Sequence, residues 1–348
     1  MKKYFYCFED TGRSGYAGGQ RITDYLISSL KDIEPNLNFT VFDRGYESKL
    51  ERNLILKKIR YKSYSRSKKY LGFFCWISVC LKKAYYLKRK RIIIYTPTRM
   101  SSFIFGIAFF VWKKNSIKWI THEHMVSHDN KIINFIYDLL SRNIDLQIFS
   151  SNYCKSTYKC NKVKLKGIFG RIVAEAIPYK TYNDNSIEKL IIAHKLESAK
   201  KRFNFISVLY VGRIHEEKGI FEFIDIFKNE ICDYKGNFDI HLYIFGPISQ
   251  NILSLLNKSI NRNIHYLGEA NISKRFYSFF DIGIVPSWNY KESLGLSGFE
   301  MAFHMKKALI CSKSKSFDQL YKINGINKLR KEEVIKQIIE LYEQSSDE

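Results

Sequence analysis

The sequence lacks the features that mark exported, membrane-spanning or metal-bound small domains. Its 7 cysteines are scattered and odd in number, and no pair has C-x2-C spacing, which fits a reducing cytoplasm. The amino terminus reaches Glu9 and Asp10 too soon for the apolar core of a signal peptide. The apolar run 71–81 has eleven residues, whereas a helix needs about 20 to cross a bilayer. We therefore expect no export and no membrane span from these segments.

Acidic residues are scarce relative to basic ones. The chain holds 57 Lys and Arg against 34 Asp and Glu, a net charge of +23, and residues 49–91 hold 15 Lys or Arg with a single acid, Glu51. Tyrosines and the run 71–81 accompany these cations, as in segments that lie on an anionic membrane, where each cation contributes about 1 kcal/mol. An amphipathic helix pair with a solvated basic face is the alternative. Nucleic-acid binding is a third interpretation, although the sequence contains no signature of a known nucleic-acid-binding module.

Apolar runs alternate between strand-like and helix-like patterns. In the amino-terminal half we predict strands at 4–8, 39–42, 92–95, 117–121 and 146–150, helices at 20–30 and 132–140, and a buried helix at 103–112. This alternation is typical of a parallel sheet covered on both faces. The second half repeats the pattern after a hydrophilic passage. With 348 residues, 45% of them hydrophobic, we predict an α/β fold of two doubly wound Rossmann-like domains facing a cleft, 1–180 and 181–348, with a linker at 179–203.

A short apolar run at 205–211 reads as a buried strand and leads directly into GRIHEEKGI. Gly212, Arg213 and Lys218 then stand at its carboxyl end, where open parallel sheets bind ligands. Glycine lets the backbone approach an anion, and the two cations can bracket a diphosphate. A surface turn with two solvated cations is the alternative.

Two carboxylates, Glu292 and Glu300, flank a Gly-Leu turn in PSWNYKESLGLSGFEMAFH. We predict a helix start within 294–297, which would offer unpaired N–H groups to a phosphate. Glu292 would then lie in the loop beside the anion, and Glu300 about one turn inside the helix, where its carboxylate can accept hydrogen bonds from paired sugar hydroxyls. The alternative is a helix that carries two solvated glutamates.

From about residue 205 to 310 the sequence resembles the donor-binding half of the retaining glycosyltransferases of family 4, which have the GT-B architecture. The motifs stand in the family's order: GRIHEEKG, HLYIFGP with Gly246, NIHYLGEA with Gly268, FYSFFDIGIVPS, and ESLGLSGFE with Gly295 and Leu296. One departure is MAFHMKKALI, where Met305 and Lys307 replace the customary Gly and Pro.

The resemblance implies a role for each matching residue. Arg213 and Lys218 would bind the nucleotide diphosphate, Glu292 would lie by the donor sugar, and Glu300 would hold the ribose. Gly212, Gly246, Gly268, Gly295 and Leu296 would complete the donor site.

The first domain offers two further candidates. The Gly-rich loop EDTGRSGYAGGQR includes Gly18 and Gly19, which the resemblance places against the donor phosphates and the acceptor; a plain turn is the alternative. His122, in ITHEHMVSH, matches a family histidine near the donor sugar, with His124 as second choice. A zinc site that adds His128 is conceivable, but no carboxylate general-base motif accompanies it.

No Asp-x-Asp motif occurs, so we expect neither a metal-bound diphosphate nor any other cofactor. We expect a retaining hexosyltransferase or related glycosyltransferase, cytoplasmic and peripheral at the inner face of the plasma membrane. It would move a sugar from a UDP-, GDP- or ADP-sugar to a lipid-linked saccharide of a bacterial surface polysaccharide such as O-antigen, capsule or exopolysaccharide, with no nucleic-acid partner. The alternatives are a non-catalytic binding protein on the same fold, or a basic membrane or nucleic-acid adaptor.

Overall fold

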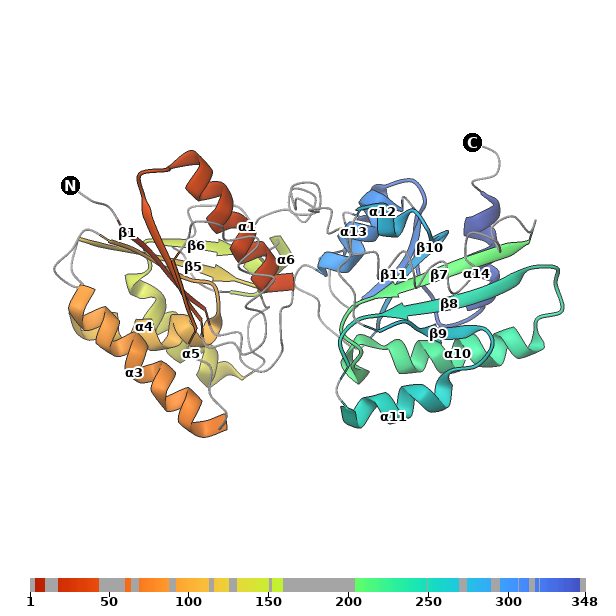
Figure 1. The fold of residues 1–348 in the computed structure, drawn as a ribbon, viewed down its shortest axis with the longest axis horizontal. Coiled ribbons are helices and arrows are strands. Elements are labelled where there is room, and N and C mark those ends of the chain that lie inside the picture. The colour runs from red at the N-terminus through yellow and green to blue at the C-terminus, as the bar shows by residue number, and fades with distance from the viewer. Residues whose placement is uncertain are drawn as a thin grey trace. The chain divides into compact units, whose positions relative to one another are not determined.

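The computed structural model of the protein contains two parallel six-stranded sheets, one in each half of the chain (Figure 1). The chain divides into the compact units Met1–Phe169 and Gly170–Glu348, called unit 1 and unit 2. The predicted linker at 179–203 lies outside the described residues, so the boundary near residue 180 stays a prediction. The structure describes residues 4–9, 18–43, 60–63, 69–87, 92–112, 116–124, 130–149, 152–158, 204–248, 250–268, 274–288, 295–305, 307–312, 317–318 and 320–344.

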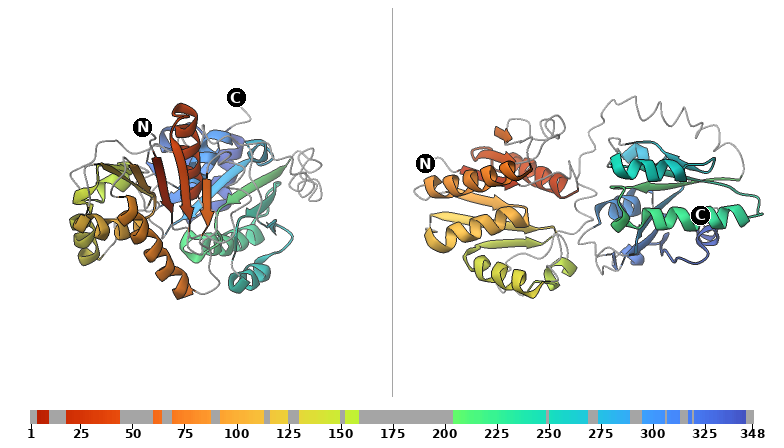
Figure 2. Two further views of the ribbon diagram at one scale, coloured as in Figure 1. Left: turned by 60° about the vertical axis from the view of Figure 1, so that its left-hand side comes forward. Right: turned by 90° about the horizontal axis from the view of Figure 1, so that it is seen from below.

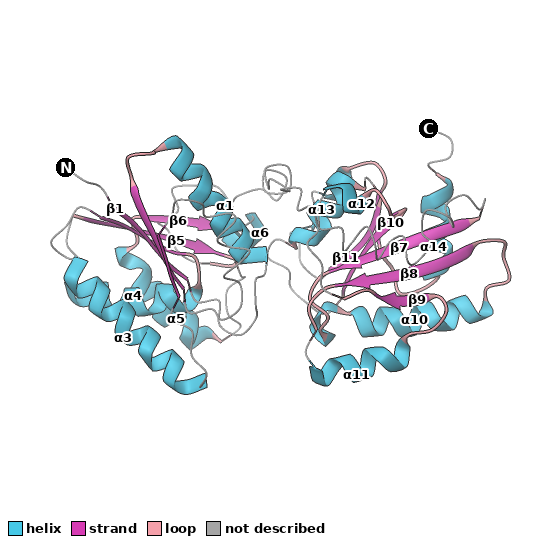
Figure 3. Ribbon diagram, viewed as in Figure 1, coloured by secondary structure: helices cyan, strands magenta, loops and turns pink. Residues whose placement is uncertain are grey.

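Unit 1 has the strand order β3-β2-β1-β4-β5-β6, with every described pairing parallel. Its strands are β1 (Tyr4–Glu9), β2 (Asn38–Asp43), β3 (Arg60–Ser63), β4 (Ile92–Thr96), β5 (Ile117–Glu123) and β6 (Leu146–Phe149). Its helices are α1 (Gly18–Ile33), α3 (Lys69–Leu87), α4 (Arg99–Trp112), α5 (Lys131–Leu140), the 3-10 turn η1 (Ser141–Asn143) and α6 (Asn152–Ser156) (Figure 3).

Alternate side chains of the unit 1 strands pack on opposite faces of the sheet, as the two-residue period of a strand requires. Phe5 and Cys7 of β1 lie in the same apolar cluster as Ile27 of α1. Phe8 lies on the other face, in a cluster with Trp76 of α3 and Phe105 of α4. Helices α3, α4 and α5 lie side by side on that second face (Figures 1 and 2).

Unit 2 repeats the architecture with the order β12-β11-β10-β7-β8-β9. Its strands are β7 (Phe205–Val211), β8 (Asp239–Phe245), β9 (Ile264–Tyr266), β10 (Ile282–Ser287), β11 (Ala308–Ser312) and β12 (Ile326–Lys328). Its helices are η2 (Glu216–Lys218), α10 (Ile220–Asp233), α11 (Gln250–Ser259), α12 (Lys274–Tyr277), α13 (Leu296–His304), η4 (Leu320–Lys322) and α14 (Val334–Glu343). The seven residues of β7 are all buried, as expected for a central strand covered on both faces.

A carboxylate fixes β10 beside β7. The backbone N–H of Ser207 donates to Asp281 Oδ2 at 2.8 Å, and its hydroxyl donates to the same oxygen at 2.5 Å. The backbone N–H of Asp281 in turn donates to the carbonyl oxygen of Ser207 at 3.0 Å. Because β7 comes first and β10 fourth along the unit, this pairing sets the reversal of strand order on which the site depends.

Several expectations for unit 1 need correction. The helix predicted as buried at 103–112 begins at Arg99 and exposes Ile107 and Phe110, because only its sheet-facing side packs. Trp76, predicted to accompany the basic segment at a membrane, is fully buried, since α3 must cover the sheet. Gly18 and Gly19 form the first turn of α1 and not a loop before it. None of the helices in the described ranges is long and apolar enough to cross a membrane.

Candidate functional site

The order of strands in unit 2 places the topological switch point between β7 and β10. From β7 the chain moves to β8 and β9 on one side, then returns to β10 on the other. Open α/β sheets bind ligands outside the carboxyl ends of the strands at this point. The segments that follow β7 and β10 contain Lys218 and the start of α13, so the switch point brings together the two predicted halves of the donor site.

Three predicted glycines form a continuous backbone edge, which we call the glycine edge: Gly212, Gly246 and Gly268. The N–H of Gly212 donates to the carbonyl of Phe245, and that of Gly246 donates to the carbonyl of Gly268, both at 3.0 Å. A Cβ on Gly246 would stand 1.9 Å from the carbonyl oxygen of Gly212. Only glycine therefore allows the chain ends of β7, β8 and β9 to lie so close together.

The turn that carries Lys218 is fixed against the end of β10. His215 caps η2 by accepting a hydrogen bond from the N–H of Glu217. Gly219 follows in the left-handed conformation, with φ of 70°, and a Cβ there would lie 1.8 Å from the carbonyl oxygen of Pro286. Sequence reasoning missed this role of Gly219, although the residue ends the GRIHEEKG motif.

The predicted diphosphate cations differ in exposure. Arg213 is exposed, and its Nη2 lies 3.8 Å from Glu217 Oε2, an exposed i,i+4 pair. Such pairs contribute little to stability, so an anion can replace Glu217 as the partner of the guanidinium. Lys218 is half-buried in η2.

Helix α13 begins at Leu296, within the range 294–297 that the sequence predicted. Gly295 precedes it with φ of 43°, and a Cβ there would stand 2.0 Å from Phe317 Cζ. Its first N–H groups lack partners within the helix and favour an anion. Glu292 lies outside the described residues.

Glu300 stands one turn inside α13, as predicted, but it is not solvated. Its side chain is 1% exposed, and Oε2 accepts a hydrogen bond of 2.8 Å from the hydroxyl of Tyr277 in α12. A buried carboxylate requires such partners. Tyr277 was not predicted, because 23 residues separate it from Glu300 and no local pattern links the two.

The unusual turn after Glu300 closes without glycine. Met305 caps α13 in the right-handed conformation, and its N–H donates to the carbonyl of Met301. Replacement of the family's customary glycine therefore does not prevent this helix from ending regularly.

His122 lies at the carboxyl end of β5 in unit 1 and is completely buried. Its Nδ1 shares a hydrogen bond of 2.7 Å with the hydroxyl of Tyr95, and its ring centroid lies 3.9 Å from that of His124. Burial, together with His124, holds the pKa of His122 well below its usual value, so the imidazole is neutral at pH 7. The catalytic role given to His122 stays a prediction.

A metal site is not evident among the residues described. They contain no group of three or more His, Cys, Asp or Glu side chains that could hold an ion. His128, the third histidine of the considered zinc site, lies outside them. Metal independence stays a prediction.

Comparisons with known proteins agree with this geometry. Two Rossmann-like units of this kind form the GT-B fold, which confirms the predicted fold class. Anabaena Alr3699/HepE, solved in complex with UDP and glucose, resembles 99% of this chain over 91% of its own length, with 16% identity and a TM-score of 0.68. The apo form of the lipopolysaccharide outer core galactosyltransferase WaaB has 14% identity and a TM-score of 0.60, over 99% and 90% of the two chains.

Residues 206–344 match the model of the family Glycosyl transferases group 1. This confirms the predicted resemblance at the level of GT-B glycosyltransferases, while assignment to family 4 stays a prediction. An uncharacterised 41.2 kDa protein in the cps region of Klebsiella pneumoniae is 25% identical over 223 residues. That alignment spans 61% of this chain and half the length of the relative.

Proposed function

We propose that the protein is a metal-independent, retaining glycosyltransferase. It transfers a sugar, a hexose or a related one, from a nucleotide-sugar donor to a lipid-linked saccharide in bacterial surface polysaccharide synthesis. It works at the inner face of the plasma membrane, on the cytoplasmic side.

One observation carries the proposal. The glycine edge, the Lys218 turn and the start of α13 with its buried Glu300 all follow strands at the switch point of unit 2. Open backbone, cations and a helix N-terminus suit a diphosphate. A carboxylate held one turn away suits a pair of sugar hydroxyls. This combination is what a nucleoside diphosphate sugar needs.

In the proposed reaction, Arg213, Lys218 and the α13 terminus stabilise the charge that develops on the leaving diphosphate. Glu300 holds the ribose, and Glu292 is assigned to the donor sugar; the role of His122 stays a prediction. The acceptor hydroxyl attacks on the face from which the diphosphate leaves. The leaving phosphate oxygen takes the acceptor's proton, so that no protein nucleophile is required and configuration is retained.

The relatives support the substrate classes without fixing them. HepE was solved with UDP and glucose, WaaB is a lipopolysaccharide galactosyltransferase, and the Klebsiella relative lies in a cps region. These names favour a UDP-sugar among the donors and a surface polysaccharide among the products.

Nucleotide binding is the first test. The melting temperature of the protein with UDP, GDP and ADP is compared with that of the free protein, since a ligand at 100 times its Kd stabilises the folded state by about 2.7 kcal/mol. We expect one nucleotide to raise the melting temperature. Lys218→Ala and Glu300→Gln should reduce that shift and abolish transfer to a lipid-linked acceptor.

Glu340→Gln is the matched control, because it makes the same change at an exposed position on α14. It should leave both the nucleotide shift and transfer intact. Near-normal transfer by either Lys218→Ala or Glu300→Gln would contradict the assigned site. Failure of all three nucleotides to bind would favour a binding protein of another specificity on the same fold.

A further inference from the structure

Helix α5 carries an apolar stripe on its outer side. Ile132, Phe135 and Ile136, spaced i, i+3 and i+4, expose 70%, 68% and 38% of their surface. Tyr137, on the opposite side of the helix, is buried, and so is Leu140 in its last turn. A surface helix usually turns its apolar stripe to the core and its polar residues to water, so the exposed stripe of α5 departs from this arrangement.

Helix α4 presents a second stripe of the same kind. Met100, Ile107 and Phe110 lie at i, i+7 and i+10 and expose 40%, 47% and 60% of their surface. The residues between them, among them Phe105 and Phe109, pack into the core. Single exposed apolar residues need no explanation, but several such residues gathered on two neighbouring helices are typical of an interaction site.

The two helices are held side by side, so the stripes form one surface, which we call the α4–α5 face. Gly106 of α4 lies so close to Leu140 that an added Cβ would stand 2.8 Å from Leu140 Cβ. Asn143, just after α5, donates from Nδ2 to the carbonyl of Phe109 at 3.1 Å. Tyr137 donates to buried Glu123 of β5, which keeps the opposite side of α5 turned toward the sheet.

The charge around this face is strongly positive. Helices α3, α4 and α5 with η1 contain six cations against one acid, Asp138. Unit 1 as a whole holds 32 Lys and Arg against 12 Asp and Glu, so that +20 of the net +23 belongs to it. The cations are Lys69, Lys82, Lys83, Arg99, Lys131 and Arg142, of which Arg99 donates a hydrogen bond to the hydroxyl of Tyr158.

We propose that the α4–α5 face docks on an anionic lipid bilayer. Its phenylalanines and isoleucines enter the boundary between headgroups and acyl chains, while surrounding cations attract the lipid phosphates. A second copy of the chain fits poorly, because it would bring another strongly cationic unit against the same face. The inference rests on the proposed function for its reason, the lipid-linked acceptor, and it places the apolar part of the contact on α4 and α5, outside segment 49–91.

Co-sedimentation of the full chain with vesicles of phosphatidylglycerol and phosphatidylcholine tests the proposal. We expect the wild-type protein to bind, and Phe110→Ser with Phe135→Ser to weaken binding by about tenfold or more, since burial of each large apolar side chain in the bilayer favours binding. The matched control is Ile33→Ser, at a 74% exposed position on α1, which covers the other face of the sheet. It should bind as the wild type does.

The nucleotide-induced rise in melting temperature is measured on the same proteins, because it reports unit 2 and not the docking face. A double variant that loses vesicle binding and keeps the nucleotide shift supports the proposal. Wild-type protein that shows the shift but does not bind anionic vesicles, or a double variant that binds them fully, overturns docking and leaves the proposed function standing. If the wild-type protein is a dimer that does not bind vesicles, and the double variant is a monomer, the α4–α5 face is instead a contact between copies of the chain, and docking is overturned.

Discussion

At the scale of single residues, the glycine edge allows a direct test of how the site is built. Gly246 has φ of 144° and a backbone oxygen 1.9 Å from any added Cβ, whereas Gly268 has φ of 83° and nothing within 4 Å. Both positions strain an L side chain, but only Gly246 also meets an obstacle. Gly246→Ala must therefore move the segment that follows β7 away from the segment that follows β8.

We predict that Gly246→Ala lowers the free energy of unfolding by more than about 2 kcal/mol, while Gly268→Ala costs only the strain of about 1 kcal/mol. Urea unfolding of the two variants measures the difference. Gly246→Ala should also lose the nucleotide-induced melting shift. Equal costs at the two positions would mean that the close approach to Gly212 is not maintained in solution.

The same residues show what sequence motifs supply. Gly212, Lys218 and Glu300 were located because each follows a recognisable apolar strand or opens a helix. Tyr277, the partner of Glu300, was not located, since it meets that carboxylate only after the sheet has formed. Motifs thus predict which types of side chain stand at the site, whereas tertiary packing determines which other residues orient those side chains.

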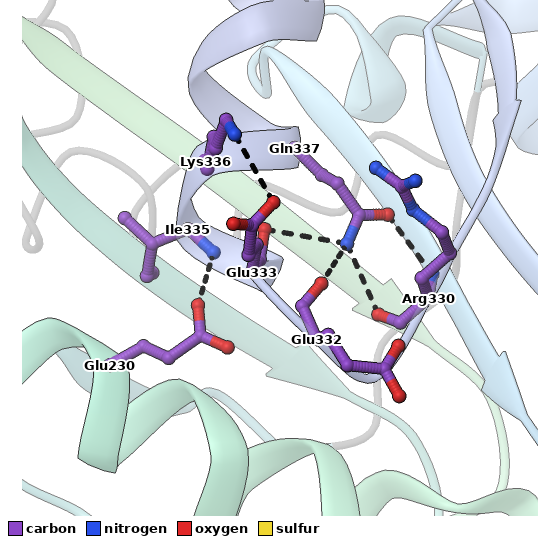
Figure 4. A network of polar contacts seen from close by, with 7 residues as sticks. All are labelled: Glu230, Arg330, Glu332, Glu333, Ile335, Lys336 and Gln337. Atoms are coloured by element: carbon purple, nitrogen blue, oxygen red, sulfur yellow. Dashed lines mark hydrogen bonds and ion pairs between the residues drawn. The ribbon is translucent and has the colours of Figure 1, made fainter.

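At the scale of elements, one buried amide links the start of α14 to the segment before it (Figure 4). Gln337 Nε2 donates to the carbonyls of Arg330, Glu332 and Glu333 at 3.2, 2.6 and 3.3 Å, and its Oε1 accepts from the N–H of Arg330 at 3.0 Å. Glu333, with φ of 57°, is the helix's N-cap. One side chain therefore joins the first turns of α14 to the segment that follows β12.

Gln337→Leu keeps the volume of the side chain and removes these hydrogen bonds. We predict a loss of about 1–3 kcal/mol in the free energy of unfolding, because the buried groups of the segment are left unpaired. Gln344→Leu, the same change at an exposed position after α14, should stay within about 0.5 kcal/mol of wild type. Thermal unfolding measures the stability of both variants. If Gln337→Leu is as stable as Gln344→Leu, water replaces the hydrogen bonds of the amide without a loss of free energy.

Element patterns were predictable to different degrees. The strands predicted in unit 1 all formed, because apolar β-branched and aromatic runs have no other stable place than a buried sheet. The edge strand β3, with the sequence RYKS, escaped prediction because its residues are polar and basic. The exposure of α4 was also missed, since an apolar helix that faces a core and one that faces a partner have the same composition.

At the scale of the whole molecule, the two units differ in net charge. Unit 1 has a net charge of +20, and unit 2 holds 25 Lys and Arg against 22 Asp and Glu, a net of +3. Unit 1 also buries His122 and Glu123 completely and shields the neighbouring ring of His124. Burial raises the pKa of Glu123 and lowers that of both histidines. The stability of unit 1 should consequently depend on pH through groups of opposite sign.

The contribution of His124, together with its effect on the pKa of His122, is obtained by comparing the wild-type protein with His124→Asn at each pH, since Glu123 is present in both. Burial lowers the pKa of His124 from 6.5 to about 4, so between these values the unfolded chain binds more protons than the folded one, and stability falls as pH falls. We predict that wild type loses on the order of 1 kcal/mol or more relative to the variant between roughly pH 7 and pH 4. Urea unfolding across this range, followed by near-ultraviolet circular dichroism, measures the difference. A constant difference in stability would mean that His124 is protonated equally in both states, and that the end of β5 admits water.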